Sequence, residues 1–161
     1  DSAVLHSTVA PQTIPEKTED TALHTVAFAG GLEIDVKPEL LGIGASRYTD
    51  LQSIHVAAVD AGGLAFLEDA ETYEGFFGFS PEGNIRDEGF AMRIANSTGL
   101  PPGAMVDLFA LGGIGSTVGA DDHIPEAEWR NIGTGTVDEA GESISFDANL
   151  PCMTWVGYKA Q

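Results

Sequence analysis

The sequence has a single cysteine, Cys152, so no disulfide can form within the chain. Basic residues are also scarce: 7 Lys and Arg stand against 25 Asp and Glu, and the formal net charge is −18. Phosphate backbones require clustered cations, whereas the arginines here are scattered singly, which argues against nucleic acid as a partner. No run approaches the roughly 20 apolar residues of a transmembrane helix, so the sequence predicts no membrane insertion.

Sustained helical periodicity is missing as well, and patterns typical of strands take its place. In LEIDV (32–36) apolar residues alternate with acidic ones, and SIHVAAV (53–59) is rich in β-branched residues. The aromatic stretch EGFFGF (74–79) precedes SPEG (80–83), whose proline and glycine positions predict a type I turn. The best helical candidates, residues 38–41 and 124–129, are each only a turn or two long.

The second half of the chain continues the strand pattern. FAMRIA (90–95) places three large apolar residues on one face, and AMVDLFAL (104–111) aligns Met105, Phe109 and Leu111. Toward the C-terminus, residues 129–137 and 143–146 predict two strands joined by Asp-Glu-Ala-Gly. Aspartate at the start of such a connection can bond its own backbone, and glycine supplies a positive φ. Residues 153–158 predict a final strand.

This spacing of nine or ten short strands, with glycine and proline turns between them, predicts an all-β antiparallel sandwich with minimal helix. We expect residues 23–161 to form a single domain of this kind. Residues 1–22 are rich in Ser, Thr and Glu and are broken by Pro11 and Pro15. We interpret them as an extended segment that is either a strand donor or a linker.

A longer pattern runs from GFFGFSPEGNIRDEGF through IANSTGLPPG to WRNIGTGTV and LPCMTW. It resembles the fibronectin-like and ZU5-like β-sandwich modules of bacterial secreted and cell-surface proteins, including those with teneurin-like repeats. The resemblance covers about residues 74–158, and its motifs are turns and core positions. It implies an extracellular or cell-surface location and a spacer or interaction role, with no catalytic residues to carry over.

The best local metal cluster is Asp121 and Asp122 with Glu126 nearby, because hard carboxylate oxygens in a loop suit Ca²⁺. These three residues lack the regular spacing of a calcium loop, and a solvated acidic loop is the simpler interpretation. No other cofactor is predicted. Cys152 lies between apolar neighbours with no base nearby, so we expect it to be a small buried core residue.

The aromatic residues between Tyr73 and Phe79 could pack in a core or offer a platform for carbohydrate. Phe76 and Phe77 are adjacent in one strand and must point to opposite faces. Packing is the default for side chains of this size. No nucleophile elbow, phosphate loop or selected carboxylate pair is present, so the sequence predicts a protein that is not an enzyme.

Two functional hypotheses follow. The first is a structural subunit that acts through protein–protein contacts, with itself or with neighbouring domains. In its sharper form the N-terminal segment pairs with a sheet edge of the next copy, giving a head-to-tail homopolymer and hence a fibre. The alternative is a calcium- or carbohydrate-binding adhesion module of a larger surface protein.

Overall fold

The computed structural model describes residues 12–13, 22–42, 53–60, 62–64, 66–85, 89–113, 116–118 and 122–161. No α-helix occurs among these residues, and none of their helical turns has the length and apolar character needed to cross a membrane. The 3₁₀ turns are η1 (Ala29–Gly31), η2 (Pro38–Leu40) and η3 (Ala70–Thr72). The strands are β1 (Gln12–Thr13), β2 (His24–Ala27), β3 (Leu32–Val36), β4 (Leu41–Gly42), β5 (Ser53–Asp60), β6 (Gly75–Ile85), β7 (Met92–Ala95), β8 (Met105–Leu111), β9 (Thr117–Val118), β10 (Asp122–His123), β11 (Trp129–Val137), β12 (Ser143–Phe146) and β13 (Cys152–Ala160).

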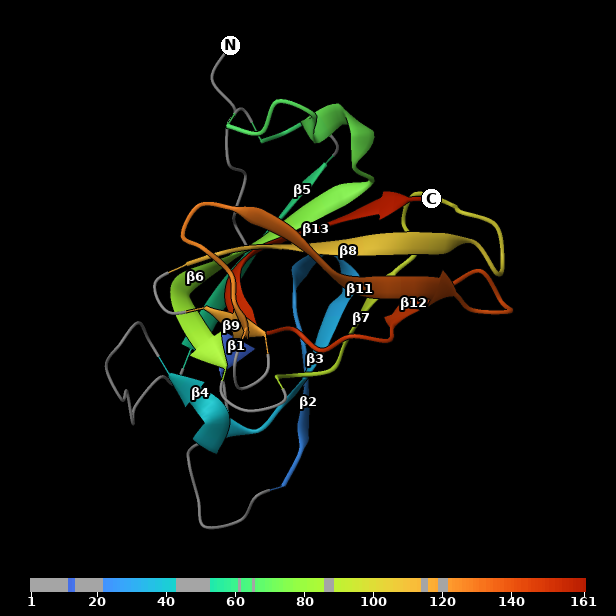
Figure 1. The fold of residues 1–161 in the computed structure, drawn as a ribbon. Helices are drawn as coiled ribbons and strands as arrows, with labels where there is room; N and C mark the ends of the chain where they lie inside the picture. Colours follow the sequence, from blue (N-terminus) through green and yellow to red (C-terminus); the bar gives the residue numbers. More distant parts are fainter. Residues whose placement is uncertain are drawn as a thin grey trace.

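Ten antiparallel strands form one continuous sheet in the order β1-β5-β6-β13-β8-β11-β12-β7-β3-β2, and β4 adds to the side of β6. Strands β9 and β10 form a separate pair. The predicted all-β antiparallel fold is therefore confirmed. The sheet curls until it is nearly closed into a barrel-like shape, which corrects the expected arrangement of two stacked sheets (Figure 1).

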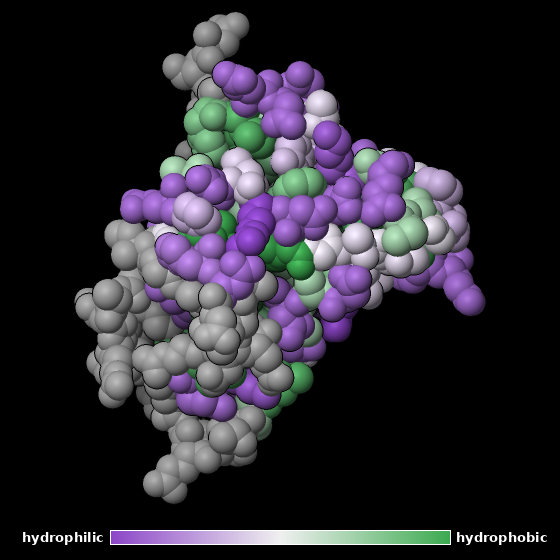
Figure 2. Space-filling model, viewed as in Figure 1, coloured by the Kyte–Doolittle hydropathy of each residue, from purple (hydrophilic) through white to green (hydrophobic). Residues whose placement is uncertain are grey.

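The main core lies inside this curled sheet. Leu32, Ile34 and Val36 of β3 are fully buried and belong to one apolar cluster with residues of β8 and β13, such as Leu108 and Val156. The outer surface is different: Figure 2 shows hydrophilic side chains over much of one face, with small hydrophobic areas between them. Along β3, alternation thus separates apolar residues that face the interior from acidic residues that face outward.

The short turn η1 helps to close the curled sheet. A Cβ atom placed on Gly30 would come within 2.6 Å of the Ala58 Cβ on β5, and one on Gly31 within 2.4 Å of the Ala95 Cβ on β7. Both glycines also have φ near +70°, a conformation that side chains disfavour. Because glycine satisfies both demands, η1 can pack between two strands that are distant in the sheet order.

The predicted turn at residues 80–83 is absent, and β6 runs through this stretch without reversing. Pairing between β6 and β13 stops at Gly78 and resumes at Gly83, with a register shift between them. Pro81 lies in this gap, where its missing N–H removes no hydrogen bond to β13. The SPEG sequence therefore marks a bulge in a long strand, and tertiary pairing overrides the local turn preference.

The residues of β8 that face the core are not the three aligned apolar residues noted in its sequence. Val106, Leu108 and Ala110 are buried in the main core. Met105 and Phe109 share the opposite face, as predicted, but that face is the outer one. An outer layer of aromatic residues covers Phe109, so apolar residues occur on both faces of β8 and the pattern alone does not distinguish them.

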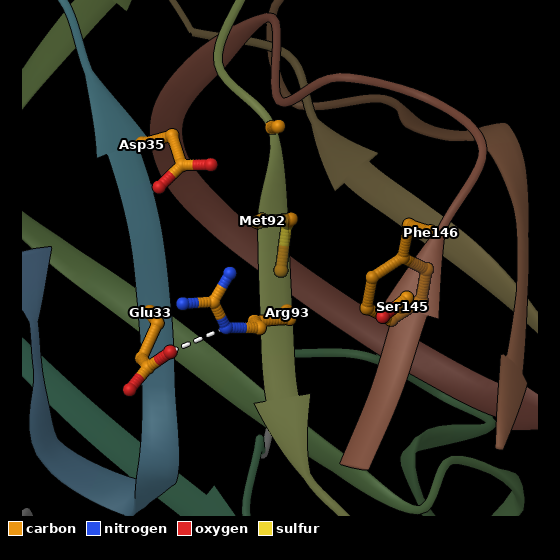
Figure 3. A pocket seen from close by; sticks show the side chains of 7 residues that line it. Glu33, Asp35, Met92, Arg93, Ser145 and Phe146 are labelled. Carbon is orange, nitrogen blue, oxygen red and sulfur yellow. Dashed lines mark hydrogen bonds and ion pairs between the residues drawn. The ribbon is translucent and has the colours of Figure 1, made fainter. Parts of the chain in front are cut away.

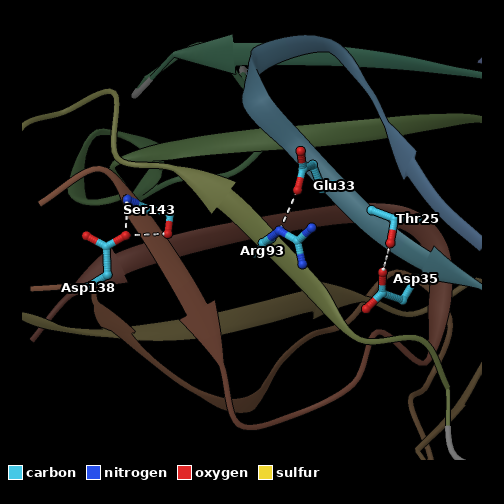
Figure 4. Close-up of polar contacts among 6 residues, drawn as sticks. All are labelled: Thr25, Glu33, Asp35, Arg93, Asp138 and Ser143. Atoms are coloured by element: carbon cyan, nitrogen blue, oxygen red, sulfur yellow. Dashed lines mark hydrogen bonds and ion pairs between the residues drawn. The ribbon is translucent and has the colours of Figure 1, made fainter. Parts of the chain in front are cut away.

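The C-terminal hairpin is confirmed in detail. Strands β11 and β12 begin and end at the predicted residues, and Gly141 has φ of 74°. The Asp138 carboxylate accepts hydrogen bonds from the Glu142 N–H (2.8 Å), the Ser143 N–H (3.0 Å) and the Ser143 hydroxyl (2.6 Å) (Figure 4). These bonds, the Ser143 hydroxyl first, lower the pKa of Asp138 below its ordinary value of 3.8.

The lowered pKa predicts a pH dependence of stability. Because the folded state holds Asp138 ionised more strongly than the unfolded state, the contribution is present above pH 3.8 and is lost as the pH falls through the folded value. We expect Asp138→Asn to destabilise the protein at neutral pH, with the difference from wild type shrinking below pH 3.8. Urea unfolding at neutral pH and below pH 3.8 measures this difference in the free energy of unfolding. Glu139→Gln in the same turn is the control, and an equal deficit for Asp138→Asn at both pH values would contradict the prediction.

Candidate functional site

The predicted calcium ligands do not come together in the described part of the chain. Asp121 lies outside it. Asp122 accepts a hydrogen bond from Arg130 at 2.9 Å, and Glu126 is exposed. The described residues contain no group of three or more His, Cys, Asp or Glu side chains arranged to hold a metal ion. The calcium site at these residues stays a prediction.

Cys152 is buried in the core, as predicted. Its Sγ lies 3.6 Å from the Thr154 hydroxyl, which donates a hydrogen bond to the Leu111 carbonyl at 2.5 Å. Burial raises the pKa of the Cys152 thiol above 9.0, so the thiol is protonated at neutral pH. A nucleophilic cysteine needs the opposite shift, and this residue therefore has the properties of a packed core thiol.

The aromatic residues of β6 are packed on both faces of the sheet. Phe77 and Phe79 belong to the main core, whereas Tyr73 and Phe76 belong to a second apolar cluster on the outer face. All four are buried, so none of them offers an exposed platform for carbohydrate. The second cluster, called here the outer cluster, consists of Leu64, Ala70, Tyr73 and Phe76 with Val59, Leu67, Phe109, Trp129 and Trp155 packed against it.

A cavity with chemically varied walls lies at one end of the curled sheet, and we call it the mouth. Its volume is about 440 Å³, within the range of small-molecule sites. Ala58 and Asp60 of β5 and Tyr158 of β13 line it, together with Glu74 and Phe77. Carboxylates, a phenol and apolar carbon thus face the same space.

Tyr158 is the most deeply buried polar group of the mouth, with 4% of its surface exposed. Burial raises the pKa of its phenol. Hydrogen bonds with the Ser97 and Thr98 hydroxyls oppose this effect and lower that pKa, whereas the negative charges of Glu74 and Asp60 add to it and raise the pKa further. Both carboxylates therefore lie close enough to the phenol to act on it, and the loop after β7 reaches across the mouth to meet β13.

A smaller cavity of about 170 Å³ lies on the outer face between β3, β7 and β12 (Figure 3). Arg93 of β7 forms an ion pair with Glu33 of β3 directly across the strands. Asp35 also lines this cavity and accepts a hydrogen bond from Thr25 at 2.6 Å (Figure 4). Because its arginine is already paired, this cavity offers less uncompensated charge than the mouth.

Sequence reasoning did not find the mouth. Its polar residues come from β5, from the residue before β6, from the loop after β7 and from β13, so no two of the four segments are adjacent in sequence. In the sequence, Asp60 directly follows the predicted strand at residues 53–59, and Tyr158 is the last residue of the predicted strand at residues 153–158. The local signals are two acidic residues, Asp60 at the end of β5 and Glu74 directly before β6. Acidic residues at such positions are common in so acidic a chain.

No protein family, curated protein or solved structure matches this chain. The resemblance of residues 74–158 to bacterial surface modules stays a prediction, as do the location and the role that it implies. The candidate sites are therefore judged by their own geometry.

Proposed function

We propose that this chain is a non-catalytic structural subunit that acts through protein–protein contacts made by the edges of its sheet. In the sharper form of the proposal, the N-terminal segment of one copy pairs with β5 of the next copy. Each subunit is then both donor and acceptor, and repetition of such a head-to-tail contact gives an open-ended fibre. An extracellular or cell-surface location is part of the proposal and is supported by the resemblance of residues 74–158.

The observation that carries the proposal is the short pairing between β1 and β5. Within the described part of the N-terminal segment, Gln12 and Thr13 pair with β5, opposite Ile54 and Ser53. The remaining six residues of β5 pair with β6 on one side and with no described strand on the other. An edge of this length is a ready template for another strand.

The register shows what a strand added at this edge would contain. Continuing the antiparallel pairing of Gln12 with Ile54 would set residues 6–11 opposite His55–Asp60. The stretch HSTVAP (6–11) is uncharged apart from its histidine, so it adds little repulsion to an acidic partner. Because β1 contributes two residue pairs to this edge, a longer pairing with another copy would add hydrogen bonds, and this favours exchange of the segment between copies.

The net charge sets the conditions for assembly. Copies that each carry a formal charge of −18 repel one another, and salt screens this repulsion over distances beyond about 10 Å at 0.1 M ionic strength. We expect the full chain to associate more strongly at high salt, and removal of residues 1–11 to abolish the association. Light scattering against protein concentration at low and high salt measures both effects.

A peptide of residues 1–11 separates strand exchange from other kinds of association. Added to the truncated chain it should bind and raise the melting temperature, and added in excess to the full chain it should cap assembly. A peptide with the same residues in scrambled order is the control. A full chain that stays monomeric at every concentration and salt, together with a peptide that does not bind, would rule the proposal out.

A further inference from the structure

The mouth is built by three strands that place their residues directly opposite one another. Asp60 of β5 pairs with Gly75 of β6, and Gly75 pairs with Tyr158 of β13. Directly opposite residues share one face of a sheet. Since Val56 and Tyr158 are buried in the main core, this face is the inner one, and alternation along β5 brings Asp60 to it.

Gly75 lets the ring of Tyr158 lie directly over the middle strand of this row. A Cβ atom at this position would lie 3.3 Å from Cε1 and 3.5 Å from the hydroxyl oxygen of Tyr158. A larger residue there would push the phenol aside or extend into the space that Asp60 and Tyr158 line. The residue type at the centre of this three-strand row therefore decides where the phenol lies in the mouth.

The walls of the mouth carry charge of one sign. Asp60 and Glu74 line it, and none of its lining residues is Lys, Arg or His. Phe77, Ala58 and Ala95 supply apolar carbon beside these carboxylates. A site with two carboxylates, no cation and an apolar wall is complementary to a positive charge carried on an apolar group.

We propose that the mouth binds a small organic cation, a primary ammonium group attached to an apolar body. The ammonium donates hydrogen bonds to the Asp60 and Glu74 carboxylates, and the body rests against the apolar wall. The opposing charge of the walls disfavours an anion. A bare metal ion would leave most of a 440 Å³ cavity unfilled and its apolar wall without a contact. This binding goes beyond the proposed assembly, because it uses inward side chains instead of the backbone of an edge.

The test uses the full chain and two probes of nearly equal shape, benzylamine and benzyl alcohol. At neutral pH only benzylamine carries a positive charge. We expect millimolar benzylamine to shift the NMR amide signals of Gly75 and Tyr158 in a saturable way, and benzyl alcohol to bind about ten-fold more weakly or worse.

Charge-neutralising variants assign the binding to the mouth. Asp60→Asn and Glu74→Gln each remove one negative charge without changing the length of the side chain. Each should weaken benzylamine binding by about ten-fold. Glu68→Gln, an exposed carboxylate outside the mouth, makes the same change in net charge and should leave binding unaltered. The proposal is overturned if benzyl alcohol binds as tightly as benzylamine, if all three variants weaken binding equally, or if no signal of the mouth responds.

Discussion

Replacing Phe76 by alanine is expected to lower the free energy of unfolding by about 3–5 kcal/mol. Phe76 is 1% exposed and packs in the outer cluster, with ring centroids 4.9 Å from Tyr73 and 6.0 Å from Trp129. It also covers Gly157 of β13, where an added Cβ would lie 2.6 Å from its ring. Its removal leaves a cavity against a backbone that cannot move inward to fill it, and urea unfolding measures the loss.

Phe66 provides the matched control for this prediction. It is also attached to the outer cluster, with its ring centroid 6.0 Å from that of Trp155 in an edge-on arrangement, but it is 60% exposed. Phe66→Ala should therefore cost only about 1 kcal/mol or less. Equal losses for the two variants would show that the outer cluster is not a packed layer.

Replacing Asn96 by aspartate is the second change with a large expected effect, a loss of about 3 kcal/mol. The Asn96 side-chain nitrogen donates to the Leu100 carbonyl at 2.7 Å and to the Gly141 carbonyl at 2.9 Å, and its oxygen accepts from the Leu100 N–H at 3.0 Å. It thereby ties the loop that reaches the mouth to the turn between β11 and β12. Aspartate removes both donors and sets a negative oxygen against two carbonyl oxygens.

The Asn96→Asp variant is measured by urea unfolding beside Asn131→Asp. Asn131 is exposed and uses only its side-chain oxygen, which accepts from the Gly133 N–H at 3.0 Å, so aspartate preserves that bond. Asn131→Asp should be nearly neutral. The deficit of Asn96→Asp should shrink in acid, since a protonated carboxyl regains a donor, and a deficit that does not depend on pH would refute the proposed cause.

Strands could be predicted where one face is apolar and the other polar. Leu32, Ile34 and Val36 alternate with acidic residues, and that stretch is strand β3 with the predicted face inward. The hairpin at residues 138–141 could be predicted because its aspartate and glycine act within the turn itself. Each of these features depends on residues that are close in sequence.

Features that depend on distant residues escaped prediction. Pro81 can lie within β6 because it falls between Gly78 and Gly83, where the pairing with β13 is interrupted, and Phe109 faces outward because the outer cluster covers it. The predicted calcium site and the mouth show the same division. Asp121, Asp122 and Glu126 were chosen because they are neighbours in sequence, whereas Asp60 and Tyr158 are neighbours only across β6.

The antiparallel β fold, the buried thiol of Cys152 and the strongly acidic character of the chain could all be predicted, because alternation and charge are properties of local sequence. The curling of the sheet into one nearly closed layer, held at η1 by Gly30 and Gly31, is visible only in the folded chain. The same is true of the meeting of Asp60 and Glu74, from separate segments, at Tyr158. Strand order and curvature place these residues, and both arise from contacts between segments far apart in the chain.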